Sequence, residues 1–152
     1  MRAFLIVAIS ALIAVGCGGT SSTRTPEGGE LPHSILDPYL KIHEALAADS
    51  TDGIRQNAGA IATAAASLGA PAVKVDTSAV QLAAAGDIAD ARGKFGQLSD
   101  AIDAYMTGFE LTTPEGVRKA FCPMVRKPWL QAGSVMKNPY YGTAMSTCGE
   151  FR

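Results

Sequence analysis

The sequence predicts a mainly α-helical protein, an antiparallel bundle of three to four helices followed by an irregular C-terminal cap that can hold short strands. Apolar residues recur at steps of three and four through the middle of the chain, which is the period of a helix with one buried face. Many of these inward positions are alanine, which favours helix and lets neighbouring helices approach closely. After residue 111 prolines become frequent and exclude long helices.

The beginning of the chain predicts export. Residues 1–16 read as a signal peptide, because Arg2 precedes an apolar run that is too short for an ordinary membrane-spanning helix. Cys17 follows Gly16 and precedes a Gly/Ser/Thr-rich stretch, so this region resembles a bacterial lipoprotein signal. The resemblance implies lipidation of Cys17, a flexible tether over 17–33 and a protein anchored to a membrane on the periplasmic side. An ordinary secretory signal with an incidental Cys17 is the alternative.

The bundle is expected over residues 34–111. Asp37-Pro38 predicts the start of the first helix, since proline is tolerated at the first helical position. A second helix is expected from Ile54 to Leu68, where Gly69-Ala70-Pro71 stops it. A weaker helix is expected over roughly 76–85, with Val80 and Ala83 facing inward.

The strongest helical period predicts one long helix over about 87–110. Its apolar positions alternate steps of three and four, which places them along one seam. Phe95, Leu98 and Ile102 are expected to be buried at the centre of this seam. The full set is Ile88, Ala91, Phe95, Leu98, Ile102, Tyr105 and Phe109.

Residues 112–152 are expected to pack on the bundle as part of the same domain. Residues 117–124 predict a short strand that lies at an edge or ends at Pro123, because proline cannot donate to a ladder. Basic residues outnumber acidic ones here, which indicates either a solvated patch or a face for an anionic partner or membrane surface. The net charge of the whole chain is −1, and nothing predicts nucleic-acid binding.

The C-terminal segment also holds both cysteines that remain after Cys17, each close to a methionine. Pro123 favours an extended backbone at Cys122, which would direct Cys122 and Met124 to the same side. Met145 and Cys148 are three residues apart and would share one face of a helical turn. If the two segments meet, these four residues form a soft donor set that suits Cu(I) or Ag(I).

A disulfide between Cys122 and Cys148 is the competing interpretation. Two cysteines in an exported domain commonly pair, and closing this loop would stabilise the fold by roughly 3–4 kcal/mol. The two interpretations can also describe two redox states of one site, because oxidation removes both thiolates. The residues alone leave this choice open.

Several short motifs carry a further resemblance: LSDA at 98–101, FCPM at 121–124, WLQ at 129–131, KNPYYG at 137–142 and MSTCGE at 145–150. Over about residues 35–151 the chain resembles a bacterial periplasmic family of unknown function. That family occurs fused to, or beside, the adaptor proteins of Cus-type copper/silver efflux systems. The resemblance implies metal handling, with an efflux adaptor as partner. Family members often carry a histidine shortly before LSD, where this chain has Gly93-Lys94-Phe95.

No catalytic motif accompanies these features. The sequence contains no nucleophile elbow, zinc-protease helix motif, phosphate-binding glycine loop or CxxC pair. His33 and His43 are interpreted as solvated and packing residues. The sequence therefore predicts a binding or sensing protein and not an enzyme, with a disulfide-stapled interaction module of the cell envelope as the alternative.

Overall fold

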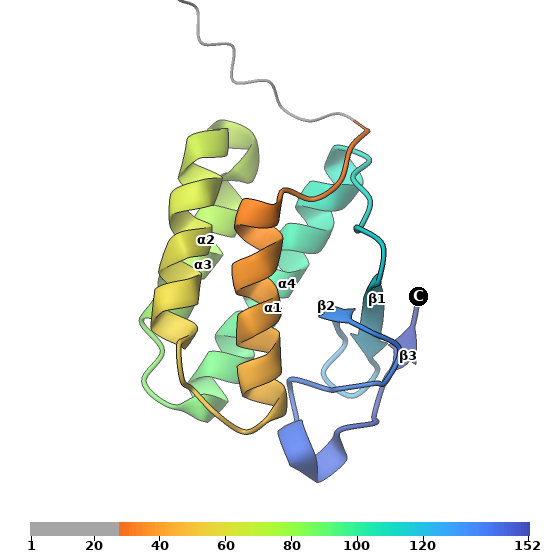
Figure 1. Cartoon of the computed structure of the whole chain (residues 1–152). Coiled ribbons are helices and arrows are strands. Elements are labelled where there is room, and N and C mark those ends of the chain that lie inside the picture. The colour runs from red at the N-terminus through yellow and green to blue at the C-terminus, as the bar shows by residue number, and fades with distance from the viewer. Residues whose placement is uncertain (1–27) are drawn as a thin grey trace, which may run out of the picture.

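The computed structural model describes residues 28–152, a helical region followed by a small antiparallel sheet (Figure 1). The predicted signal peptide, the predicted lipidation site Cys17 and residues 18–27 of the predicted tether lie outside the described residues. The helices are α1 (His33–Ala47), α2 (Ile54–Leu68), α3 (Val73–Ala83) and α4 (Ile88–Gly108), with a 3-10 turn η1 (Ala70–Ala72) before α3. The C-terminal part contains β1 (Val117–Cys122), β2 (Lys127–Ala132), the 3-10 turn η2 (Gly142–Met145) and β3 (Glu150–Phe151). The prediction of a mainly helical protein with a short-stranded cap is confirmed.

Helix α4 follows its predicted seam. Phe95, Leu98 and Ile102 are buried as expected. The helix begins after Asp87, whose carboxylate accepts a hydrogen bond from the Asp90 backbone N–H at 2.8 Å. This side-chain cap satisfies one of the donors that a helix start leaves unpaired, which explains why α4 begins here.

The predicted start of the first helix was wrong. Helix α1 begins at His33 and contains Pro38 in its interior. Ile35 and Leu36 are buried upstream of the proline, and burying two such side chains contributes about 3–6 kcal/mol. An interior proline costs about 3 kcal/mol, and the carbonyl left without a donor belongs to exposed Ser34. Burial therefore outweighs the proline penalty.

The inward face predicted for the third helix was wrong in part: Ala83 is half-buried and packs against the core, but Val80 does not. Helix α3 starts at Val73, and its buried residues are Val75, Ala79 and Leu82. Val80 is 56% exposed, because it lies one residue, and so about 100° of helix rotation, beyond Ala79. Helix α2 matches its expected bounds: it ends at Leu68 and is followed by Gly69.

The strands form an antiparallel sheet in the order β2-β1-β3. Strand β1 ends at Cys122, directly before Pro123 as expected, but it is the central strand and not an edge. Pro128 lies in β2, an edge strand that tolerates proline. Phe121 pairs with Pro128 of β2 on one side and with Glu150 of β3 on the other, so the end of β1 is held by both neighbouring strands.

The segment before α1 is also part of the fold, although the tether was expected to extend to residue 33. Leu31 is fully buried, and its backbone N–H donates to the Thr112 carbonyl at 2.9 Å. The Thr112 N–H donates in turn to the Gly29 carbonyl at 2.9 Å. The burial of one leucine and this backbone pairing therefore dock residues 28–32 against the chain that follows α4.

An aromatic cluster joins the sheet to the helices. Tyr39 of α1 stacks on Phe95 of α4 with ring centroids 4.9 Å apart, and Tyr140 lies 6.0 Å from Phe95. Trp129 of β2 meets Tyr140 edge-on at 5.9 Å. The cap and the helices therefore contribute side chains to one hydrophobic core.

Candidate functional site

Cys122 and Cys148 lie next to one another at the end of the sheet. Cys122 is the last residue of β1 and is fully buried, whereas Cys148 precedes β3 and is half-buried. Because Phe121 pairs with Glu150, the antiparallel register carries Cys122 alongside Gly149. The sheet thus brings together two cysteines that are far apart in the sequence.

Asn138 connects the two cysteines. It is fully buried, and its side-chain Nδ2 donates to the Cys148 carbonyl at 2.6 Å and to Cys122 Sγ at 3.4 Å. Its Oδ1 accepts from the Tyr140 backbone N–H at 2.8 Å. The amide group therefore has partners on both sides, which fixes its orientation and holds both cysteine segments in place.

The thiols also affect one another. Burial raises the pKa of the Cys148 thiol, and the charge and hydrogen bonding of Cys122 raise it further. Such a shift requires the two side chains to be close, since an adjacent thiolate disfavours ionisation of its neighbour. Both thiols are free in the structure.

Gly149 makes the close approach of the two chain segments possible. A Cβ at this position would lie 2.6 Å from Trp129 Cη2, 3.2 Å from the Phe121 carbonyl oxygen and 3.3 Å from Met136 Sδ. Its φ of +151° is also one that residues with a side chain rarely adopt. The thioether of Met136 is therefore beside the residue that follows Cys148.

The four sulfur-bearing residues predicted from the sequence are not equally placed. Met124 is 62% exposed and lies in the turn between β1 and β2. The extended backbone expected from Cys122 to Met124 was wrong, because the strand ends at Cys122 and turns. Met145 is half-buried in η2, and its carbonyl accepts from the Cys148 N–H at 3.1 Å, so these two share one turn as expected.

Sequence reasoning missed Asn138 and Met136. Asn138-Pro139 was interpreted only as a turn, and the amide's burial depends on the sheet that covers it. Met136 lay outside the two Cys-Met pairs that directed attention to the region. The KNPYYG stretch was the one sequence signal that could have indicated Asn138. Its asparagine does not precede a predicted helix, so capping a helix does not explain it.

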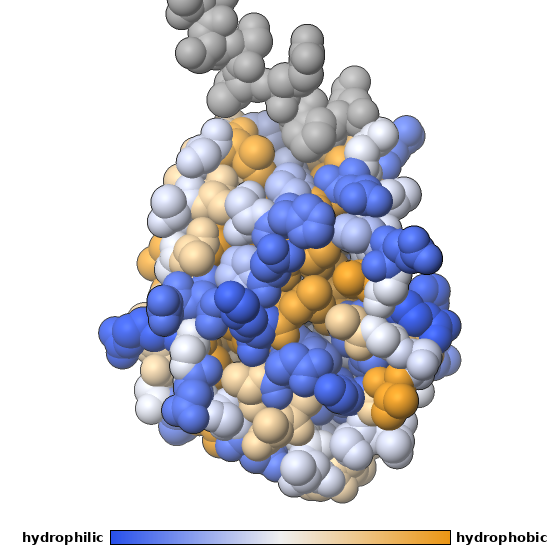
Figure 2. All heavy atoms as spheres, in the orientation of Figure 1, coloured by the Kyte–Doolittle hydropathy of each residue, from blue (hydrophilic) through white to orange (hydrophobic). Residues whose placement is uncertain are grey.

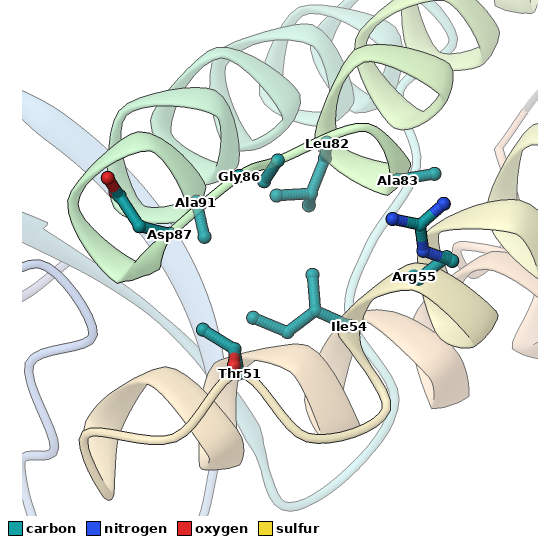
Figure 3. Close-up of a pocket in the computed structure, with 9 residues that line it drawn as sticks. Thr51, Ile54, Arg55, Leu82, Ala83, Gly86, Asp87 and Ala91 are labelled. Carbon is teal, nitrogen blue, oxygen red and sulfur yellow. The ribbon is translucent and has the colours of Figure 1, made fainter.

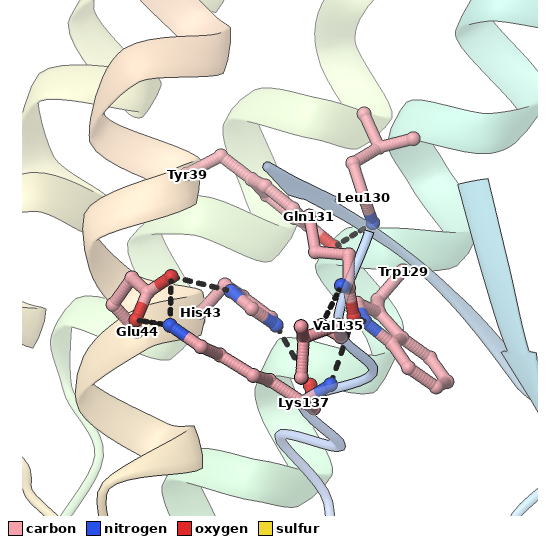
Figure 4. Close-up of polar contacts among 8 residues, drawn as sticks. All are labelled: Tyr39, His43, Glu44, Trp129, Leu130, Gln131, Val135 and Lys137. Carbon is pink, nitrogen blue, oxygen red and sulfur yellow. Dashed lines mark hydrogen bonds and ion pairs between the residues drawn. The ribbon is translucent and has the colours of Figure 1, made fainter. Parts of the chain in front are cut away.

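A polar network holds the chain leading to Asn138 against α1 (Figure 4). His43 is fully buried, and its Nε2 donates to the Lys137 carbonyl at 2.8 Å. The side-chain oxygen of Gln131, Oε1, accepts hydrogen bonds from the Lys137 backbone N–H at 3.1 Å and from Trp129 Nε1 at 3.0 Å. Glu44 completes the cluster through an ion pair with the Lys137 ammonium at 2.9 Å.

A second clamp holds η2. Asp49 accepts from the Thr143 backbone N–H at 3.1 Å and is ion-paired with Arg92 of α4. The Thr143 and Arg92 contacts lower the pKa of the Asp49 carboxyl to about 2. Gly142 has positive φ, and a Cβ there would overlap both Asp49 and Arg92, which explains the glycine.

Within the described part of the chain, most basic residues of the cap, though not Arg126, have structural partners. Lys119 pairs with Asp103, Lys127 pairs with Asp100, and Lys137 pairs with Glu44, so each links the cap to a helix. Arg118 and Arg152 lie over the rings of Phe151 and Phe121, each 3.7 Å from the ring centroid. Figure 2 shows hydrophilic side chains spread over the visible face with apolar patches between them. The excess of basic residues in the cap is thus largely explained by pairing with single acidic residues on the helices.

A pocket of about 190 Å³ lies at another place in the helical region (Figure 3). Ile54 and Leu82 line its apolar side, while Thr51, Arg55 and Asp87 supply polar groups. None of its lining residues comes from the cap, so this pocket is separate from the thiol pair.

Within residues 28–152 no group of three or more His, Cys, Asp and Glu side chains is arranged to hold a metal ion. Over the same range no helix has the length and apolarity needed to traverse a bilayer. Comparison with protein-family models, with curated proteins and with solved structures found no match for this chain.

Proposed function

We propose that this protein binds or senses a soft metal ion, Cu(I) or Ag(I), through the thiolates of Cys122 and Cys148. The observation that supports this most directly is the shared Asn138 amide, which bonds Cys122 Sγ and the Cys148 carbonyl. Metal-binding residues are commonly held by such a surrounding layer of hydrogen bonds. Thiolates are the donors that Cu(I) prefers.

The thioethers refine this donor set. Met136 contacts the chain at Gly149, and Met145 is joined to Cys148 by a backbone hydrogen bond. Either could add a soft donor to the two thiolates, whereas Met124 points to solvent from a turn. We therefore assign Met136 and Met145, in preference to Met124, as the auxiliary ligands of the proposed site.

Metal binding at this site must release protons. Because the pKa of the Cys148 thiol is raised, the thiol is largely protonated at neutral pH, and a metal ion has to displace that proton. We expect Cu(I) affinity to increase as pH rises, up to the pKa of the free thiol. No step of catalysis is part of this proposal.

The test is a Cu(I) titration of reduced protein against a chromogenic Cu(I) chelator of known affinity. We expect about one equivalent to bind. Cys122→Ser and Cys148→Ser should abolish binding, and Met136→Leu should weaken it. Met124→Leu is the matched control, because it removes an exposed thioether at similar volume and should leave affinity unchanged. Unaltered affinity in both cysteine variants would refute the site.

The alternative is a Cys122–Cys148 disulfide that staples an interaction module of the cell envelope. The adjacency of the two side chains favours this function as well, because the bond would tie the end of β1 to the segment before β3. Protein recovered from its native compartment with no free thiols, and with no Cu(I) uptake after reduction, would support the staple over the metal site.

The proposal also includes location and context. We infer a lipid-anchored protein on the periplasmic side of a membrane that acts beside a heavy-metal efflux adaptor. The lipoprotein-like Cys17 and the motif resemblance over residues 35–151 support this. Wild-type protein should fractionate with membranes, and Cys17→Ser should release it; recovery of unlipidated wild-type protein in the soluble fraction would contradict the anchor.

We further infer that the four helices form an antiparallel bundle. Successive helices contact one another, and their connections are short. Figure 1 shows the chain direction reversing from one helix to the next. Short connections between packed helices favour this arrangement.

A further inference from the structure

The two cysteines differ in their access to solvent. Cys148 is half-buried and lies in the irregular chain before β3. Cys122 is fully buried behind it, with the Asn138 amide on its sulfur. Where two thiols are adjacent and one is more accessible than the other, the more accessible sulfur reacts with an outside disulfide and the buried one completes the exchange.

We propose that this pair is a thiol–disulfide exchange couple in which Cys148 takes the external disulfide and Cys122 resolves it. This goes beyond metal binding and does not require it. The structural basis is the difference in burial, together with the β1–β3 register that carries Cys122 alongside Gly149. Asn138 holds both segments, so neither sulfur has to travel far for the second step.

The exchange has two balanced steps. Cys148 loses its proton to solvent, and its sulfur attacks one sulfur of an external disulfide, RSSR. A Cys148–S–R bond forms, and one RS⁻ leaves and takes up a proton. Cys122 then loses its proton and attacks Cys148 Sγ, which forms the internal disulfide and expels the second RS⁻. Two protein thiols are oxidised, and one external disulfide is reduced to two thiols.

One consequence concerns the metal site and rests on the proposed function. The oxidised pair offers no thiolate, so the external disulfide and Cu(I) would compete for the same two sulfurs. Bound Cu(I) should then protect the pair from exchange. The exchange order itself is independent of this competition and is tested without metal.

The test uses the full chain carrying Cys17→Ser, so that Cys122 and Cys148 are its only thiols. Reduced protein is mixed with glutathione disulfide, and intact masses are followed over time. With Cys122→Ser added, the glutathione adduct on Cys148 should accumulate and persist. With Cys148→Ser instead, adduct formation should be slower by about tenfold or more, because Cys122 is buried. The parent should lose two hydrogens in mass and accumulate little adduct.

Equal adduct rates in the two variants, or a stable adduct in the parent without an internal bond, would overturn the proposal. Trp129 fluorescence confirms that each variant is folded, since the indole is buried in the native state. If a variant is unfolded, the transient adduct in the parent is trapped with acid and mapped by digestion; an adduct on Cys122 would also overturn it. If the protein undergoes this exchange but binds no Cu(I), the proposed function alone is refuted. If it binds Cu(I) but Cys148 does not react before Cys122, the exchange proposal alone is refuted.

Discussion

Replacing Gly149 with alanine is the sharpest structural test of how the two cysteine segments meet. The added Cβ would lie 2.6 Å from Trp129 Cη2, closer than carbon atoms can approach without displacement. Trp129 is 1% exposed and packed in the core, so it has little room to move. The Phe121 carbonyl oxygen at 3.2 Å is backbone and resists displacement as well.

Two costs add at this position. Forcing a new methyl group into a packed site costs about 1–3 kcal/mol. Holding a non-glycine residue at a φ of +151° costs about 1–3 kcal/mol more. Allowing for partial relaxation, we expect Gly149→Ala to lower the free energy of unfolding by about 2–4 kcal/mol.

Urea unfolding under reducing conditions measures this effect, with fluorescence of Trp129, the only tryptophan, as the signal. The midpoint should fall by about 1–2 M urea. Gly93→Ala is the matched control, because Gly93 is exposed in α4 with nothing within 4 Å of its would-be Cβ. It should stabilise the protein by up to about 1 kcal/mol. A Gly149→Ala midpoint at or above wild type would refute the packing described for this site.

Three further substitutions test the core and its pH dependence. Leu98→Ala should lower the free energy of unfolding by about 2–5 kcal/mol, and an unchanged midpoint would mean that this face of α4 is not core. Tyr105→Phe removes a buried hydroxyl that has no hydrogen-bond partner within residues 28–152, so it should raise the free energy of unfolding by about 1 kcal/mol in the same assay. A loss of stability would contradict the conclusion that this hydroxyl is unpaired. Burial lowers the pKa of His43 in the folded protein below 6.5, the ordinary value that it has in the unfolded chain. As pH falls below about 6.5, the unfolded chain therefore takes up a proton more readily than the folded protein does, and the free energy of unfolding should decline. His43→Gln should reduce that decline between pH 7.5 and pH 5, and identical pH profiles would contradict the neutral buried imidazole.

Local sequence patterns were sufficient for the helices whose signals agreed with one another. In α4 the apolar period, the Asp87 cap and the absence of proline all favour one helix, and the structure has it. In α1 the local signal at Pro38 conflicted with burial of Ile35 and Leu36, and burial was stronger. A cap motif contributes about 1 kcal/mol, so it cannot outweigh two buried aliphatic side chains.

The sequence by itself determined that this chain has a helical region and a sulfur-bearing cap, because both follow from the order and type of neighbouring residues. The sequence also favours soft ions over hard ones for the proposed metal site, since ligand chemistry is a property of the side chains. Only the tertiary structure decided which sulfurs meet. Cys122 and Cys148 are joined through strand register and the buried Asn138 amide, whereas Met124 leaves the site because the chain turns at Pro123. These contacts connect residues distant in sequence, and their geometry depends on packing that no local pattern encodes.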